Sequence, residues 1–73
     1  MEDQDLIRMA NQIAVFFQPY TDEEAIKGVA EHIAMFWEPR MRSQLLALAK
    51  NSPQDLSPIV MRALKQPSLT LSN

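Results

Sequence analysis

The sequence predicts an all-α fold, a small bundle of three to four helices with short connections. Three observations support this class. Only one of the 73 residues is glycine, no alternating valine- or threonine-rich run indicates a strand, and apolar residues recur at helical spacing through most of the chain. We expect a single helical domain over residues 1–66 and a flexible C-terminal tail over residues 67–73.

The first helix is expected over residues 4–18, because apolar residues recur there about every 3.6 residues. The predicted inward stripe consists of Leu6, Met9, Ala10, Ile13, Phe16, Phe17 and, beyond the helix, Tyr20. Pro19 ends this helix, since proline disfavours helical geometry at the residue before it and has no N–H to donate. Val15 falls outside the stripe, on the face that Arg8 and Asn11 occupy.

A second helix begins at Thr21, because Thr21 and Glu24 have the T-x-x-E spacing of a capping box. Its predicted inward stripe consists of Ala25, Ile26, Val29, Ala30, Ile33, Phe36 and Trp37. Gly28 and Met35 fall among charged residues on the opposite side. We expect them to form a small flat patch that another surface can approach closely, since glycine has no side chain.

Pro39 separates the second helix from a third, which we expect to run to about Lys50, because proline fits the first position of a helix. The stretch His32 to Leu46 is therefore a corner between two helices. A short fourth helix is expected after the Ser57-Pro58 pair, and Pro67 ends it.

The corner holds the candidate contact residues. Trp37 is interpreted as a core residue rather than as part of a cofactor site, with an indole N–H that needs an acceptor. Glu38 and Arg42 are four residues apart and can pair if the corner is smooth. Arg40 is expected to point away from the apolar stripe of the third helix that contains Leu45. Two interpretations of Arg40 stay open, a solvated charge and a bidentate anchor to a carboxylate on another subunit.

Several apolar residues have no obvious inward place in a four-helix core. Exposed apolar residues need no explanation singly, but this many in a short chain indicates an interface. They are Ile7, Val15, Met35, Leu46, Leu69 and Leu71. Leu69 and Leu71 alternate, which suits docking on a partner as an extended segment.

Composition argues against several functions. The net charge of −2 does not fit a nucleic-acid footprint, and the absence of cysteine beside a single histidine, His32, does not fit structural zinc. No apolar run approaches the ~20 residues of a membrane span, and the acidic N-terminus lacks the basic region of a secretory signal, so we expect a cytoplasmic protein. His32 is interpreted as an edge residue. We predict no catalytic, cofactor-binding or metal-binding residue.

Three blocks of the sequence resemble one known family. They are MANQIAVFF at 9–17, GVAEHIAMFWEPRMRSQLLA at 28–47 and LSPIVMRAL at 56–64. In order and spacing they resemble the delta subunit family of NAD-dependent, molybdenum- or tungsten-containing formate dehydrogenases, over roughly residues 6–64. The most specific portion is the F-W-E-P-R-M-R block, from Phe36 to Arg42.

This resemblance implies a non-catalytic accessory subunit of a cytoplasmic complex, one that binds and stabilises the large catalytic (alpha) subunit. It implies partner subunits that carry bis-molybdopterin guanine dinucleotide, iron-sulfur clusters and FMN, with beta and gamma subunits passing electrons to NAD. The alternative is a transient assembly chaperone that assists insertion of the molybdenum cofactor. The family offers no catalytic residues to carry over. Our own hypothesis for the partner-binding residues is Met35, Trp37, Glu38, Arg40, Arg42 and Val15.

Overall fold

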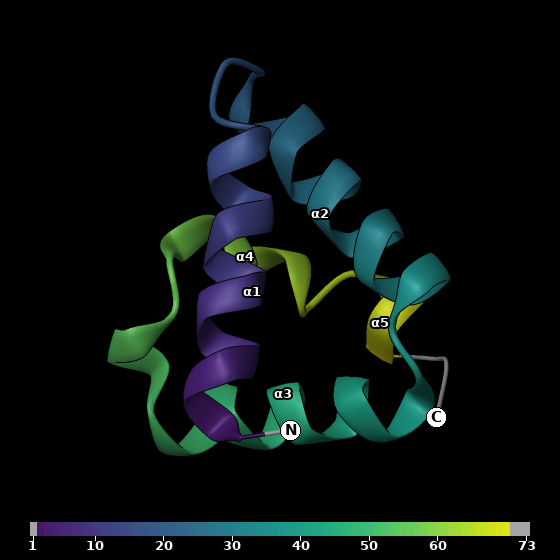
Figure 1. The fold of residues 1–73 in the computed structure, drawn as a ribbon. Coiled ribbons are helices and arrows are strands. Elements are labelled where there is room, and N and C mark those ends of the chain that lie inside the picture. Colours follow the sequence, from purple (N-terminus) through teal and green to yellow (C-terminus); the bar gives the residue numbers. More distant parts are fainter. Residues whose placement is uncertain (1, 71–73) are drawn as a thin grey trace.

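The fold consists of short helices joined by tight connections (Figure 1). The structure is a computed structural model, and it describes residues 2–70, apart from the side chains of residues 68 and 70. The helices are α1 (Asp3–Phe16), α2 (Asp22–Phe36), α3 (Pro39–Asn51), α4 (Pro58–Ala63) and α5 (Pro67–Thr70), with a 3-10 turn, η1 (Pro53–Asp55). Over the described range the chain forms no strand. The predicted all-α class is confirmed.

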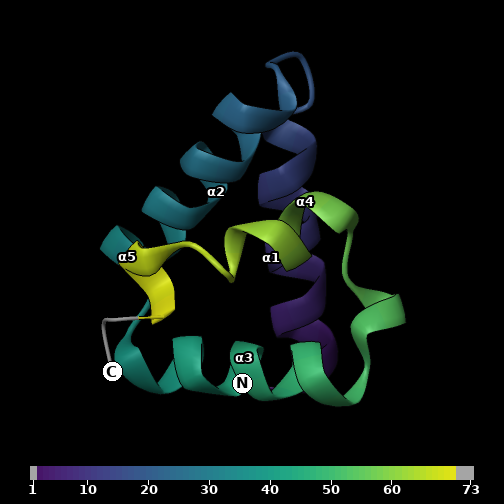
Figure 2. The same cartoon turned by 180° about the vertical axis from the view of Figure 1, so that it is seen from behind.

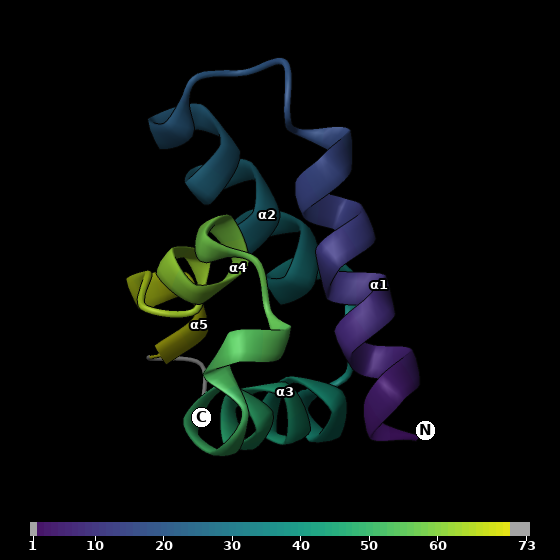
Figure 3. The same ribbon diagram turned by 90° about the vertical axis from the view of Figure 1, so that its left-hand side faces the viewer.

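Helices α1 and α2 form a V that closes at the turn between them (Figure 1). Helix α3 crosses below the open end of the V, and α4 and α5 lie behind the V in the view of Figure 1 (Figures 2 and 3). Helix α2 packs mainly against α4 and α5, whereas its contact with α1 is smaller. One side of the lower half of α2 therefore has no helix against it.

The closed end of the V depends on a contact between Phe17 and Gly28. A Cβ atom at position 28 would lie 2.7 Å from Cζ of Phe17, which is closer than carbon atoms pack, so the ring can lie here only because the residue is glycine. The rings of Phe16 and Tyr20 flank Phe17 at centroid distances of 5.2 and 5.5 Å. The flat patch expected at Gly28 is thus covered by this chain's own ring, which corrects that expectation.

The signals at the helix starts are confirmed. Oγ1 of Thr21 accepts a hydrogen bond from the backbone N–H of Glu24 at 3.2 Å, and Oε1 of Glu24 accepts one from the N–H of Thr21 at 3.3 Å. Oγ of Ser57 accepts from the N–H of Val60 at 3.3 Å, at the start of α4. Pro39 is the first residue of α3.

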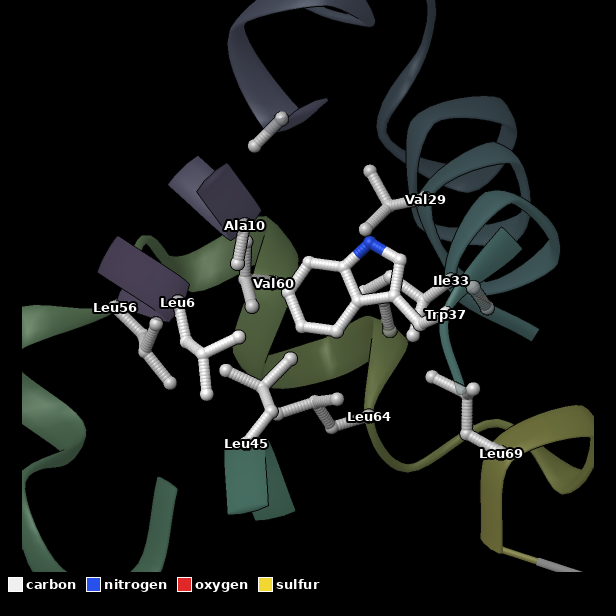
Figure 4. Close-up of a cluster of buried hydrophobic side chains, with 13 residues drawn as sticks. Leu6, Ala10, Val29, Ile33, Trp37, Leu45, Leu56, Val60, Leu64 and Leu69 are labelled. Atoms are coloured by element: carbon white, nitrogen blue, oxygen red, sulfur yellow. The ribbon is translucent and has the colours of Figure 1, made fainter. Parts of the chain in front are cut away.

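One hydrophobic core lies between the helices (Figure 4). Its largest member is Trp37, only 5% exposed, whose indole projects from the end of α2 toward Ala10 and Val60. The predicted core position of Trp37 is confirmed. The other members are Leu6, Ala10, Ala14, Val29, Ala30, Ile33, Leu45, Leu56, Val60, Ala63, Leu64 and Leu69.

Leu69 corrects the expectation for the C-terminal tail. The segment Pro67–Thr70 forms helix α5 rather than an extended segment, and this turn directs Leu69 into the core, where it is buried. The expectation that Leu69 docks on a partner is wrong. Leu71 lies outside the described residues. Ile7 and Leu46, for which the sequence offered no inward position, are both half-buried against the core.

Polar side chains tie α1 to the second half of the chain. Nδ2 of Asn11 donates to the carbonyl oxygen of Asp55 at 3.0 Å, and its Oδ1 accepts from the N–H of Ser57 at 2.9 Å. Nε2 of Gln44 donates to a carboxylate oxygen of Asp3 at 2.8 Å. These bonds fix the loop before α4 and the position of α3 relative to α1.

Candidate functional site

The elbow between α2 and α3, which we define as residues 35–42, is held from inside by Arg42. Its Nη1 donates to the carbonyl oxygen of Ala34 at 3.0 Å and to that of Trp37 at 3.1 Å. Carbonyl groups in the last turn of a helix lack partners within the helix and carry the negative end of its dipole. A guanidinium from the first turn of α3 therefore satisfies the end of α2 and joins the two helices.

The expected pairing of Glu38 with Arg42 is not formed, because Arg42 is used inside the elbow. The only ion pair among the described residues joins Arg8 to Asp5 at 2.9 Å. The corner is not a smooth continuation of α2, since Trp37 and Glu38 are both extended. Glu38 and Arg42 keep the four-residue spacing of α3, because the N–H of Arg42 donates to the carbonyl oxygen of Glu38 at 3.0 Å. They stay unpaired because the side chain of Arg42 turns toward the end of α2.

The outer side of the elbow is apolar and uncovered. Met35 is 75% exposed and Phe36 is 69% exposed, and Glu38 and Arg40 are exposed beside them. The outward positions predicted for Met35 and Arg40 are confirmed, whereas the inward position predicted for Phe36 is wrong. The reason lies in the V, because α1 has diverged from α2 at this level and offers nothing to bury the ring (Figure 1).

Exposed rings continue from the elbow along α2 to the end of α1. His32 is exposed and lies against Phe36 with ring centroids 4.9 Å apart. Gly28 lies one turn earlier on the same side of α2, and the ring of Phe17 packs against it. We call this surface the aromatic ridge and define it as Phe16, Phe17, Tyr20, His32 and Phe36.

Phe16 also corrects the sequence prediction. It is 71% exposed, although it was placed in the inward stripe of the first helix. The buried residues of α1 are Leu6, Ala10 and Ala14, which follow each other at four-residue spacing. Neighbours in a helix point about 100° apart, so the adjacent aromatics Phe16 and Phe17 do not both face the centre of the core. The same geometry separates Phe36 from Trp37 and is a signal that the sequence analysis missed.

The six predicted partner-binding residues do not form one surface. Met35, Glu38 and Arg40 are exposed on the elbow, whereas Trp37 is in the core and Arg42 is half-buried beneath it. A direct contact between Trp37 and a partner is thus not available in this fold.

Val15 lies in a different place from the elbow. It is exposed as predicted, but it lines a shallow groove with Pro58 and Ile59, between α1 and the start of α4. Val15 therefore does not extend the elbow surface.

Residues 2–70 contain neither a cluster of metal ligands nor a helix that could span a membrane. No three side chains of histidine, cysteine, aspartate or glutamate come together there as ligands of a metal ion would. None of the helices in this range is long and apolar enough to cross a membrane.

Comparisons with known proteins identify the family. The model of the NADH-dependent formate dehydrogenase delta subunit family, FdsD, matches residues 5–64, and this range includes most of α1, the elbow and α4. Neither the curated proteins nor the solved structures gave a match. Because the match spans most of the sequence, the chain belongs to the formate dehydrogenase delta subunit family.

Proposed function

We propose that this chain is a non-catalytic accessory subunit of a cytoplasmic NAD-dependent formate dehydrogenase, and that it binds and stabilises the large catalytic (alpha) subunit. The reaction and its cofactors then belong to the partners. Bis-molybdopterin guanine dinucleotide, iron-sulfur clusters and FMN would be bound by the alpha, beta and gamma subunits, and this chain would contribute contacts only. Membership of the delta subunit family supports this assignment.

The observation that carries the proposal is the aromatic ridge together with Met35. Phe16, Tyr20 and Phe36 are more than half exposed, and so is Met35. Soluble monomers seldom leave large apolar side chains gathered on one face, because burying them against a partner gains about 25 cal/mol per Å² of apolar surface. Aromatic residues and methionine are also enriched at protein interfaces.

The ridge has a rigid support. The V is closed by Phe17 on Gly28, and the elbow is fixed by Trp37 in the core and by Arg42 on the last turn of α2. A partner therefore meets side chains that are already positioned, which lowers the entropy lost on binding. This arrangement supports a docking function for the outer elbow and gives Trp37 and Arg42 an indirect part in it.

Stoichiometric co-purification tests the proposal. The chain is expressed together with the alpha, beta and gamma subunits, the complex is isolated through a tag on the alpha subunit, and intact-complex mass spectrometry determines its composition. We expect one copy of this chain for each alpha subunit in the active, cofactor-loaded enzyme. Its omission is expected to lower the yield or the thermal stability of the complex and to leave formate oxidation by each intact, loaded enzyme unchanged.

The same preparation separates this function from that of a transient chaperone. A chaperone that assists cofactor insertion would be present on alpha subunits lacking the cofactor and absent from the active enzyme. Absence of this chain from the loaded complex would replace the accessory-subunit assignment by the chaperone, and failure to bind either form of the alpha subunit would contradict both.

A further inference from the structure

The two halves of the chain carry opposite charge. Residues 1–38 contain eight carboxylates and two cationic side chains, a net charge of −6, whereas residues 39–73 contain one carboxylate and five cations, a net charge of +4. Helix α3 has no acidic residue and carries Arg40, Arg42 and Lys50. Arg62 and Lys65 follow in α4 and just after it. The modest charge of the whole chain conceals this separation.

An open apolar groove lies within the basic half, between α3 and α4. On the α3 side its wall is the stripe Ser43, Leu46, Ala47 and Lys50, and on the other side it is Met61, Leu64 and Lys65. The α3 set follows helical spacing, whereas Leu64 and Lys65 lie in the turn just after α4, so the groove runs along α3 and past the end of α4, and its lining is mostly apolar. Lys50 and Lys65 are both exposed and stand at opposite walls.

We propose that this groove binds an acidic amphipathic helix of a partner subunit. The inference rests on the proposed function, since it names the kind of segment that a formate dehydrogenase subunit presents to this chain. The groove and the aromatic ridge share no residue, because the ridge belongs to α1, the turn after it and α2, and the groove to α3, α4 and the turn after α4. The chain then contacts its complex through two surfaces of different chemistry.

The chemistry of the groove selects this occupant. An amphipathic helix places an apolar stripe into a groove between two helices and keeps its polar side in water. Ser43 and Ala47, one turn apart on α3, are small enough to let the backbone of a third helix approach. Acidic side chains at the borders of its apolar stripe then meet Lys50 on one wall and Lys65 on the other. Within residues 2–70 no carboxylate lines the groove to compete for these cations.

Charge reversal at the rim tests the proposal. The affinity of Lys50→Glu and of Lys65→Glu for the alpha, beta and gamma complex, prepared without this chain, is measured by biolayer interferometry at two salt concentrations. We expect each variant to bind about fivefold more weakly than the wild type at ~50 mM salt and within about twofold of it at ~500 mM, because salt screens the attraction. Lys27→Glu, an exposed cation on α2, is the matched control and is expected to bind as the wild type does.

Site-specific cross-linking identifies the occupant. The chain has no cysteine, so Lys65→Cys and, as the control, Lys27→Cys each place one photoreactive label. We expect the label at position 65 to attach to a partner peptide with acidic residues at helical spacing. Attachment only to a second copy of this chain, to nucleic acid or to a peptide without acidic residues would overturn the inference.

The outcomes also separate the inference from the function on which it rests. Wild-type affinity and salt dependence in both rim variants would refute the groove and leave the accessory subunit intact. If the wild type itself did not bind the complex, both the accessory-subunit assignment and the proposed binding at the groove would be refuted. Circular dichroism confirms that each variant keeps the helical content of the wild type, since every substituted lysine is exposed.

Discussion

The inner and outer sides of the elbow differ, although their residues alternate within a few positions of sequence. Trp37 is 5% exposed and its neighbour Phe36 is 69% exposed. Arg42 binds two carbonyl groups of the chain, whereas Arg40, two residues earlier, is exposed. The contrast indicates that one side of the block supports the fold and that the other side is available for contact. Matched substitutions on the two sides are therefore expected to differ in how much stability they remove.

Trp37→Ala is expected to give the largest effect on stability. Removing an aromatic side chain from a packed core costs about 3–5 kcal/mol, and a chain of this length has only a small margin. Phe36→Ala is the matched control and is expected to change the free energy of unfolding by less than about 0.5 kcal/mol, because its ring is exposed. Urea denaturation followed by circular dichroism measures both, and equal losses would remove the contrast.

Arg42→Met is expected to give the next largest effect. The substitution keeps much of the aliphatic packing but removes both hydrogen bonds to the end of α2, for an expected loss of about 1–3 kcal/mol. Arg40→Met, which removes the same charge from an exposed position, is expected to stay within about 0.5 kcal/mol of the wild type. The same denaturation experiment compares them. A smaller loss in Arg42→Met than in Arg40→Met would show that the elbow is not held by this guanidinium.

Gly28→Ala extends the comparison to the other end of α2. Alanine in place of glycine inside a helix normally stabilises a protein by about 1 kcal/mol. Here the added Cβ atom meets the ring of Phe17, and we expect a net loss of about 1–2 kcal/mol instead. In a Phe17→Ala background the same substitution is expected to become stabilising. Thermal melts of the four proteins test this, and stabilisation by Gly28→Ala in the wild-type background would contradict the close packing.

Local signals in the sequence were sufficient for the helices and for the corner at Pro39. A capping box, a serine before a proline and an apolar period are each set by residues close together in the chain. Residues whose environment depends on which helices meet were less predictable. Phe36 was placed inward because its position fits the apolar period of the second helix, but the ring is uncovered because α1 diverges from α2 at this level. Leu69 was placed outward because it lies beyond the four expected helices and alternates with Leu71, but one turn of helix buries it.

The candidate site shows the same limit. Met35 and Arg40 were identified as exposed from their position opposite the apolar stripe. The use of Arg42 was not predictable, because its acceptors are backbone carbonyls that become available only where α2 stops. Asn11 was placed on the outer face, yet it binds a loop more than forty residues away. Contacts of this kind form only once the helices have assembled, and no periodic pattern in the sequence indicates them.

The most direct test of the docking surface is the affinity of Phe36→Glu for the alpha, beta and gamma complex. Gln54→Glu in η1 is the control, since it adds the same charge at an exposed position of another element. We predict that Phe36→Glu melts within about 3 °C of the wild type but binds at least about tenfold more weakly, because a buried charge replaces an apolar contact. Gln54→Glu is predicted to bind as the wild type does. Wild-type affinity in a folded Phe36→Glu protein would contradict the assignment of the outer elbow as a docking surface.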